Sequence, residues 1–96
     1  MISILSTAEF SVWFEGLGDR VGKARIGARL AAAAVGNFGK CEPVGAGVSE
    51  MKINFGPGYR VYFKRSGSVV YVLLCGGDKS TQKRDIQRAL KLAGQV

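Results

Sequence analysis

The sequence predicts an α+β domain built as a small antiparallel sheet with two N-terminal helices packed on one face and a C-terminal helix. Three observations carry this prediction. The first two are the helical spacing of apolar residues in the first third and the period-two alternation of side chains in residues 50–55 and 59–64. A third is the short glycine-containing turns that join the alternating segments, because such turns make neighbouring strands antiparallel. At 96 residues, we expect residues 1–96 to form a single domain.

The N-terminal third predicts a strand and then a helix. Ile2–Leu5 is short and apolar, which suits a strand. The run 6–9 reads as a capping box in which Ser6 accepts a hydrogen bond from the start of the helix. Apolar side chains then recur at helical spacing at Phe10, Trp13, Phe14 and Leu17. Gly18 is the predicted stop of this first helix.

A second helix is predicted from Asp19, as its cap, to about residue 35, because alanine is abundant there. Its apolar residues lie on two sides, with Ile26 and Leu30 on one and Val21, Ala28 and Val35 on the other. A helix that is apolar on two sides is usually covered on two sides. One cover is the sheet, and the other is either the first helix or a partner protein.

The second half predicts strands in the order that completes β-α-α-β-β-β-α. Residues 36–47 are rich in glycine and form a loop that encloses a short strand at Lys40–Pro43. Two alternating strands follow, joined by Gly56-Pro57-Gly58, and Val69–Cys75 is apolar on both sides, as in a central strand. A last helix runs from about Thr81 to Ala93. This order predicts an α+β domain with helices on one sheet face.

The composition narrows the classes of function. The 14 Lys and Arg against 7 Asp and Glu give a net charge of +7, which predicts attraction to nucleic acid, an anionic membrane or an acidic protein. With no histidine, imidazole metal binding and imidazole acid–base catalysis are excluded. Cys41 and Cys75 support neither a disulfide framework nor a zinc site, so we expect no metal and no cofactor. No signal peptide or membrane span is visible, so we expect cytoplasmic residence.

The polar side of the alternating strands is the first candidate site. If the alternation holds, one exposed sheet face displays Glu50, Lys52, Asn54, Arg60, Tyr62 and Lys64. Cleavage of a phosphodiester by its own 2′-OH needs a base, positive charge on the phosphorane and an acid for the leaving 5′ oxygen. The planar fork of Arg60 suits the phosphorane.

Two other side chains of this face have open roles. Lys52 could act as the base only if crowding by like charges favoured its neutral form, and otherwise it is a second electrostatic clamp. Tyr62 could stack on a base or donate a proton. The alternative is a solvated face with ordinary cross-strand pairs, such as Glu50 with a facing Lys or Arg.

The run Gly76–Ser80 and the last helix are the second candidate. Glycines ahead of a helix, followed by Lys and Ser, resemble a phosphate-binding loop in outline, but the Walker A spacing is absent. We expect the glycines to make a turn, Asp78 or Ser80 to cap the helix, and Lys79 to point toward the sheet face. Basic residues for nucleic-acid binding are Lys64, Lys83 and Arg84, although charge on a helix is usually a solvated face.

A family resemblance covers nearly the whole chain. The run from Val48 to Ala89, with Gly36-Asn37-Phe38-Gly39-Lys40 and the helical N-terminal half, resembles the RelE/ParE superfamily of bacterial type II toxins. Within it, the sequence is most similar to the HigB-like branch often labelled "addiction module killer protein". The resemblance implies the same element order, a bacterial or archaeal cell, and an antitoxin of the helix-turn-helix class encoded beside the toxin.

The resemblance also implies site residues. In RelE-type nucleases a catalytic Arg on the strand matching residues 59–63 falls on Arg60, a basic residue just past the following strand falls on Lys79, and basic residues of the preceding strand match Lys52. The chain departs from that pattern because the C-terminal tyrosine is absent near Asp85 and the histidines of other HigB-like toxins are absent altogether. Tyr62 is the candidate substitute.

Three functions follow. The first is a toxin that cuts mRNA in the ribosomal A site, a metal-independent endoribonuclease acting by 2′-OH attack that blocks translation and arrests growth. The second is a ParE-like inhibitor of DNA gyrase that does no chemistry. The third is a degenerate toxin that only binds its antitoxin. The expected partners are the antitoxin together with ribosome and mRNA, or DNA gyrase in the second case.

Overall fold

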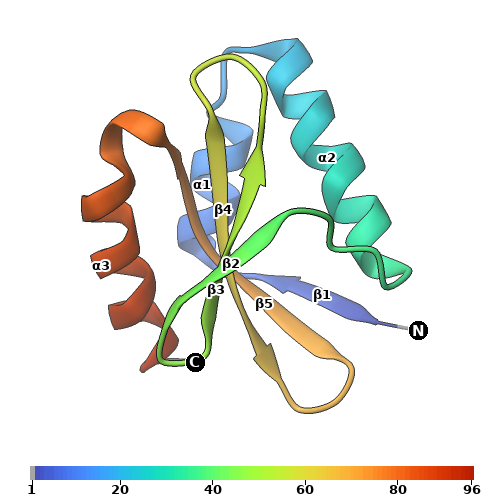
Figure 1. The fold of residues 1–96 in the computed structure, drawn as a ribbon, viewed down its shortest axis with the longest axis vertical. Coiled ribbons are helices and arrows are strands. Elements are labelled where there is room, and N and C mark those ends of the chain that lie inside the picture. Colours follow the sequence, from blue (N-terminus) through green and yellow to red (C-terminus); the bar gives the residue numbers. More distant parts are fainter. Residues whose placement is uncertain (1) are drawn as a thin grey trace.

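The computed structural model describes residues 2–96 and has the predicted α+β class. The elements are β1 (Ser3–Ser6), α1 (Ala8–Glu15), α2 (Arg20–Ala34), β2 (Cys41–Gly45), β3 (Val48–Ile53), β4 (Tyr59–Ser66), β5 (Val70–Asp78), a single 3-10 turn η1 (Lys79–Thr81), and α3 (Gln82–Ala93). Figure 1 shows the helices arranged around the strands. The short strand expected at 40–43 is present as β2, displaced by a residue or two.

The five strands form one mixed sheet in the order β1-β5-β4-β3-β2. The three neighbouring pairs from β2 to β5 are antiparallel, as their short turns predict. β1 lies parallel to β5, with Ser3 opposite Val70, so the expectation of a purely antiparallel sheet is wrong at this edge. The reason is that β1 and β5 are joined by most of the chain, and no tight turn fixes their direction.

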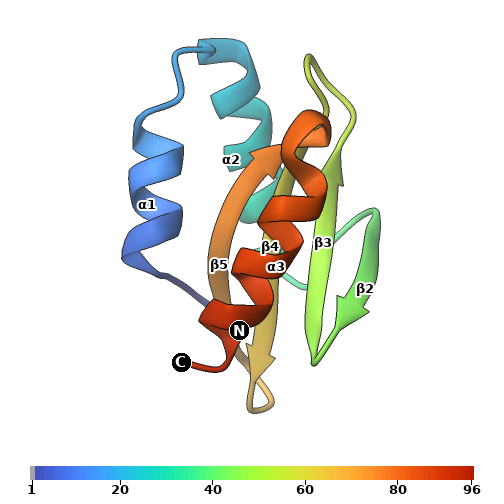
Figure 2. The same cartoon turned by 90° about the vertical axis from the view of Figure 1, so that its left-hand side faces the viewer.

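Helices cover both faces of the sheet. On the α1 and α2 face, the buried cluster is Phe10, Ile26, Ala33, Met51, Ile53, Tyr59, Val61, Phe63 and Leu73. On the α3 face it is Val48, Tyr62, Leu74, Cys75, Ala89 and Ala93. Figures 1 and 2 show α1 and α2 together and α3 apart from them. The period-two alternation of the strands assigns neighbouring residues to opposite faces.

The position of α3 corrects an expectation. The sequence interpretation leaves the polar side of β3 and β4 exposed, but α3 packs over much of it, against Tyr62 and Cys75. The physical reason lies in β5, which is apolar on both sides and therefore needs a cover on each face. The apolar side of α3, formed by Ile86, Ala89 and Leu90, supplies the second cover.

The helix caps agree with the sequence in one case and differ in another. Asp19 caps α2, accepting from Gly22 N at 2.9 Å, and it also accepts from the Tyr59 hydroxyl at 2.9 Å. α1 is capped by Thr7, which accepts from Phe10 N at 3.1 Å, and not by Ser6. Ser6 is the last residue of β1, so the helix begins one residue later than expected and Thr7 occupies the N-cap position. α1 also ends earlier than expected, with its C-cap at residue 16.

Gly76 and Gly77 lie inside β5 and do not form the expected turn. A Cβ at Gly76 would overlap the Trp13 ring of α1, and a Cβ at Gly77 would overlap the Asp85 carboxylate of α3. The two glycines therefore let a helix approach each face of the strand. The cap expected on the last helix lies one turn earlier: the Asp78 carboxylate accepts from the backbone N–H of Ser80 at 2.8 Å and so caps η1. Thr81 occupies the N-cap position of α3 and makes no side-chain capping bond within the described residues.

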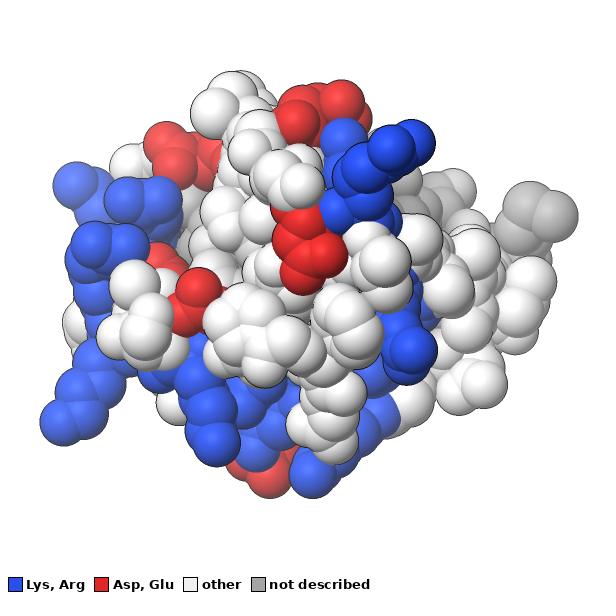
Figure 3. All heavy atoms as spheres, turned by 90° about the horizontal axis from the view of Figure 1, so that it is seen from above, with Lys and Arg blue, Asp and Glu red and all other residues white. Residues whose placement is uncertain are grey.

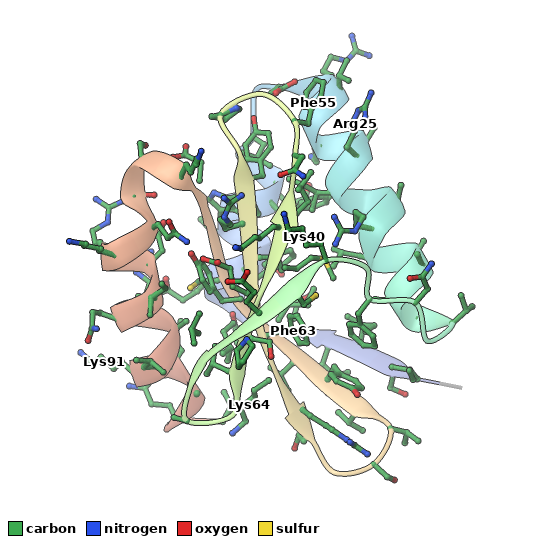
Figure 4. All side chains as sticks on the ribbon, viewed as in Figure 1. Arg25, Lys40, Phe55, Phe63, Lys64 and Lys91 are labelled. Atoms are coloured by element: carbon green, nitrogen blue, oxygen red, sulfur yellow. The ribbon has the colours of Figure 1, made fainter. Side chains whose placement is uncertain are left out.

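The second apolar side of α2 is not covered by α1. Val21 and Val35 are exposed, Val35 to 82%. Close to this side, a hollow of about 520 Å³ lies between α2 and the end of β3, lined by Val21, Ala24, Arg25, Ala28, Arg29, Ile53, Asn54 and Phe55. The Arg25 guanidinium lies over the Phe55 ring, 4.6 Å from its centroid (Figure 4). Within residues 2–96, no helix has the length and apolar character required to cross a bilayer.

Candidate active site

The register of β2, β3 and β4 places like charges directly opposite one another. Glu42 faces Glu50, and Lys52 faces Arg60. Like charges in directly opposed positions destabilise a sheet, but long side chains can also reach their diagonal neighbours. Here the diagonals carry the ion pairs: Lys52 Nζ lies 3.0 Å from Glu42 Oε2, and Arg60 Nε lies 4.0 Å from Glu50 Oε1. We call these four residues the charge quartet.

Arg60 is the least ordinary member of the quartet because it is buried, at 6% exposed. The sequence places it on the face opposite α1 and α2, which is correct. The expectation that it is exposed is wrong, because the β3–β4 hairpin, Glu50 and Lys79 lie around it. Its Nη1 donates to the carbonyls of Gly58 and Tyr59, both at 3.1 Å. Its Nε is buried and has no hydrogen-bond partner within residues 2–96. An unpaired buried donor is costly, so this one calls for a functional explanation.

Glu50 is also buried, at 2% exposed, and holds two further hydrogen bonds. Its Oε2 accepts from the Tyr62 hydroxyl at 2.7 Å and from Gln82 Nε2 of α3 at 2.8 Å. The carboxylate is thus shared between β3, β4 and α3. Sequence reasoning gave Glu50 no role beyond a cross-strand pair.

Tyr62 does not fit the roles expected of it. The side chain is 0% exposed under α3, so it can neither stack on a base nor exchange a proton with a substrate. Burial, and then the hydrogen bond to Glu50, raise the pKa of Tyr62 above its ordinary value, which keeps the phenol protonated. Tyr62 is therefore part of the support beneath the site.

Arg60 and Lys79 meet at an open hollow. The hollow has a volume of about 300 Å³ and is lined by residues 54–58 of the β3–β4 hairpin together with Arg60 and Lys79. A Cβ on Gly58 would lie 3.4 Å from Lys79 Cδ and 3.5 Å from Arg60 Nη1, so the two cationic side chains flank this glycine. Gly58 has a φ of +79°, which only glycine adopts readily. As expected, Lys79 is directed toward the sheet side.

Lys52 lies beside this hollow without lining it. Its nearest ionic partner is the Glu42 carboxylate, and that hydrogen bond, with the charge of Lys52, lowers the pKa of Glu42. The nearest charged neighbour of Lys52 is therefore a carboxylate and not another cation. This arrangement favours Lys52 as an electrostatic clamp.

The three residues expected to bind nucleic acid separate into two groups. Lys64 Nζ donates to the carbonyls of Ala93 at 2.9 Å and Val96 at 3.2 Å, so it ties β4 to the end of α3. Figure 4 shows Lys64 at the opposite end of the sheet from the β3–β4 hairpin. This contact gives Lys64 a structural role, and its expected role in binding is corrected accordingly.

Lys83 and Arg84 are exposed on the first turn of α3. With residues 79–82 they line a second hollow of about 470 Å³. Arg84 is paired with the buried Asp85 at 3.8 Å, which leaves the guanidinium largely exposed. Figure 3 looks onto the end of the molecule that carries the hairpin and shows Lys and Arg side chains along its left and lower edges and at the right, with several carboxylates among them.

Two supporting residues have weak sequence signals. Gln82 lies on α3, 32 positions from Glu50, and no sequence pattern around it predicts a contact with the site. Asp85 is buried at 2% and accepts a hydrogen bond from the Thr81 hydroxyl. The sequence indicates Asp85 only indirectly, through Gly77, because any side chain at position 77 would overlap the Asp85 carboxylate. Within the described residues 2–96, no three His, Cys, Asp or Glu side chains come together as a metal site would require.

A mixed five-stranded sheet with helices on both faces and a cationic hollow at one hairpin defines the class of this protein as a small basic α+β domain. A protein of Haemophilus influenzae, whose printed name is "Uncharacterized protein", is 44% identical over 95 residues, which is 99% of this chain and 96% of the relative. The chain therefore belongs to the same family as that protein. No protein-family model matches the chain. No solved structure matches it either.

Proposed function

We propose that this protein is the toxin of a type II toxin–antitoxin module in the HigB-like branch of the RelE/ParE superfamily, and that it cuts mRNA on the ribosome. The observation that supports this most directly is the pairing of Arg60 and Lys79 at one open hollow. A guanidinium and an ammonium at one concave site suit a phosphate of a nucleic-acid backbone. Action on ribosomes places the protein in the cytoplasm.

The proposed reaction is attack of a ribose 2′-oxygen on the adjacent phosphorus. The P–O bond to the 2′-oxygen forms, the P–O5′ bond breaks, and the products are a 2′,3′-cyclic phosphate and a 5′-hydroxyl. Arg60 and Lys79 stabilise the charge that develops on the phosphorane, and Lys52 adds to the positive potential. Because the nucleophile belongs to the substrate, the cut requires no metal-bound water.

The proposed dependence on the ribosome would follow from the proton transfers. Lys79 is exposed at the hollow and can give a proton to the leaving 5′ oxygen. The residues that line the hollow, 54–58 with Arg60 and Lys79, include neither a carboxylate nor an imidazole. We therefore propose that the base which removes the 2′-OH proton comes from the ribosomal RNA or from the message itself.

Lys83 and Arg84 extend this cationic surface along the start of α3. We propose that they contact phosphates of ribosomal RNA or mRNA, while Lys79 faces the cut. Phosphate contacts of this kind make affinity depend steeply on salt. Replacing both by Ala should weaken binding of the toxin to ribosomes and lower the salt dependence of that binding, with the cleavage pattern unchanged.

One observation favours a second candidate, a ParE-like inhibitor of DNA gyrase that does no chemistry. The hollow lacks its own base, and Tyr62, which was to substitute for the missing acid–base residues, is buried. In that case the cationic hollow would serve binding alone. Loss of gyrase supercoiling with intact mRNA would favour this candidate, and a toxin that affects neither would be the degenerate form that only binds its antitoxin.

In each case we propose a helix-turn-helix antitoxin encoded beside this protein. The support is physical: α2 carries Arg20, Lys23, Arg25 and Arg29 and no acidic residue, and its outer apolar side is uncovered. An acidic segment bound in the hollow along α2 would contact Asn54 and Phe55. These two residues also line the hollow that holds Arg60 and Lys79. Such a partner would block the site. If no protein from a neighbouring gene binds the toxin or suppresses its toxicity, this part of the proposal fails.

The decisive experiment incubates the purified protein with ribosomes that carry a defined mRNA and, in parallel, with the naked mRNA. We expect cuts only in the ribosome-bound message, with 2′,3′-cyclic phosphate ends, and we expect Arg60→Ala and Lys79→Ala to abolish or strongly reduce them. Lys91→Ala is the matched control, because Lys91 is an exposed cation on α3, distant from the hairpin (Figure 4). Intact mRNA in both samples would overturn the nuclease proposal and bring the gyrase assay forward.

A further inference from the structure

The Arg60 guanidinium is held on one side and left open on another. Its Nη1 is fixed by the carbonyls of Gly58 and Tyr59 at 3.1 Å. Its Nε is buried and faces Glu50, whose Oε1 lies 4.0 Å away, too far for a hydrogen bond. For Nη2, the hydrogen bonds found within residues 2–96 include no acceptor. The group is thus anchored by Nη1, attracted to Glu50 through Nε, and has Nη2 to spare for a ligand.

The Glu50 carboxylate that attracts Arg60 is itself held rigidly by two donors from different elements. The Tyr62 hydroxyl comes from β4, at 2.7 Å, and Gln82 Nε2 comes from α3, at 2.8 Å. Both donors bind Oε2, which leaves Oε1 to face Arg60. The placement of Arg60 therefore depends on how α3 sits on the sheet, although the hydrogen bonds and the ion pair of Arg60 within residues 2–96 involve no α3 side chain.

We infer that Glu50 is a positioning residue for Arg60, and that Tyr62 and Gln82 hold Glu50 in place so that α3 sets the orientation of the guanidinium. Its effect on cleavage rests on the proposed function, but the orientation of Arg60 can be measured without it. Glu50 touches no substrate, because it is buried behind Arg60. A shift of Oε1 by about 1 Å would turn the ion pair into a hydrogen bond to Nε, and a bound anion that draws on the guanidinium would favour that shift.

A charged carboxylate beside a phosphate-binding arginine should weaken phosphate binding, so a structural role alone does not account for Glu50. Glu50 brings negative potential close to a site that is proposed to bind a phosphate, and two apolar residues would fill the same space without it. The carboxylate fixes the orientation of the guanidinium. Orientation matters because a displacement of a catalytic group by about 1 Å can lower the reaction rate about 100-fold. On this view, the Nε donor has no hydrogen bond in the free protein and gains one from Glu50 Oε1 when an anion binds Arg60.

The experiment compares Glu50→Gln with the wild-type protein. Gln keeps the shape and can still accept from Tyr62 and Gln82, but it removes the charge that faces Arg60. In a ¹⁵N spectrum of the arginine side chains, assigned with Arg60→Lys, we expect the Nε–Hε signal of Arg60 to shift and to exchange faster with water. In ribosome-dependent cleavage we expect kcat to fall about 10- to 100-fold while KM changes less than about 3-fold.

Gln82→Ala provides a second and milder variant if Glu50→Gln does not fold. It loosens Glu50 from the α3 side, and it should move the Arg60 Nε–Hε signal in the same direction with a smaller loss of kcat. Gln87→Ala is its matched control, since Gln87 is an exposed glutamine on the same helix. Glu50→Asp, which keeps the charge, should recover part of the signal position and of kcat.

The outcomes separate the two proposals. An Arg60 signal and a kcat that remain unchanged in folded Glu50→Gln, or in Gln82→Ala when only that variant folds, would overturn the positioning role. If wild-type protein cuts no mRNA, the proposed function fails, and the Arg60 signal still decides whether Glu50 orients the guanidinium. A shifted signal with unchanged kcat would show that Glu50 orients Arg60 but does not set the rate, which overturns its catalytic consequence.

Discussion

The two faces of the sheet differ in what they bury. The face under α1 and α2 holds an apolar cluster, and its polar groups are paired: the Tyr59 hydroxyl donates to Asp19, and Arg29 donates to backbone carbonyls. The face under α3 is apolar over Val48, Leu74 and Cys75 but carries the charge quartet at its hairpin end. One face thus supplies stability by burying apolar side chains, while the other places like charges opposite one another, an arrangement that stability alone does not require.

The largest expected effect falls on the charged face. Arg60→Ala removes both the proposed phosphate contact and the partner of Glu50, so cleavage should drop by about 1,000-fold or more. The fold should persist, because Glu50 keeps its hydrogen bonds from Tyr62 and Gln82. Arg60→Lys should also be poor, since a point charge cannot replace a bidentate fork. Cleavage kinetics combined with circular dichroism test this, and a folded, fully active Arg60→Ala would refute the site.

The apolar face should show the opposite behaviour. Ile26 is 0% exposed at the centre of the α2 contact, so Ile26→Ala should lower the free energy of unfolding by about 2–5 kcal/mol. The variant that remains folded should keep near-normal cleavage, because Ile26 does not reach the hairpin hollow. Urea unfolding and kinetics at low temperature make the measurement. A large loss of kcat in the folded fraction would show that the two faces are coupled.

Tyr62→Phe tests a residue that belongs both to the apolar cluster under α3 and to the hydrogen bonds around Glu50. The ring remains in the apolar cluster, but Glu50 loses one hydrogen bond, which should cost about 1–2 kcal/mol of unfolding free energy. Because Tyr62 is buried, we expect cleavage to fall far less than in Arg60→Ala. A loss as large as that of Arg60→Ala would instead restore Tyr62 as a group that takes part in the reaction.

Lys64 tests the far end of the α3 face. Its ammonium binds two carbonyls at the end of α3, so Lys64→Met should lower stability by about 1 kcal/mol and leave ribosome affinity almost unchanged. Thermal unfolding and binding to ribosomes at several salt concentrations would measure both. Lys83→Ala is the matched comparison, with the reverse expectation of weaker binding and unchanged stability.

The smallest effect is a pH dependence on the apolar face. The backbone N–H of Gly22, and then the Tyr59 hydroxyl, lower the pKa of Asp19 from its ordinary value of 3.8. A carboxylate with a depressed folded-state pKa contributes stability above its unfolded pKa, and the contribution is lost as the pH falls through the folded value. The stability difference between wild type and Asp19→Ala should therefore be full near neutral pH and shrink below about pH 4. A difference that grows on acidification would contradict this.

The sequence predicted much of the candidate site. Arg60, Lys52 and Lys79 are basic residues at alternating or post-strand positions, and the structure brings Arg60 together with both of the others. The Gly-Pro-Gly sequence predicted the hairpin turn, and the structure places Gly56 and Gly58 at positive φ, a conformation that favours glycine. The sequence failed for Tyr62 and Lys64, since alternation predicts which side of a strand a residue occupies and not what packs there. It also missed Glu50 and Gln82, because their contact joins segments 32 residues apart.

The α+β class, the antiparallel hairpins, the Asp19 cap and the opposite faces of neighbouring residues in β3 and β4 could all be predicted from the residues alone. These follow from local backbone geometry, from side-chain periodicity and from turn residues, all of which are encoded over a few positions. Three features needed the folded chain: β1 joins the sheet in parallel, α3 covers the polar face, and Glu50 is buried between Tyr62, Gln82 and Arg60. These depend on which apolar surfaces find each other across the whole chain, and a local pattern does not contain that choice.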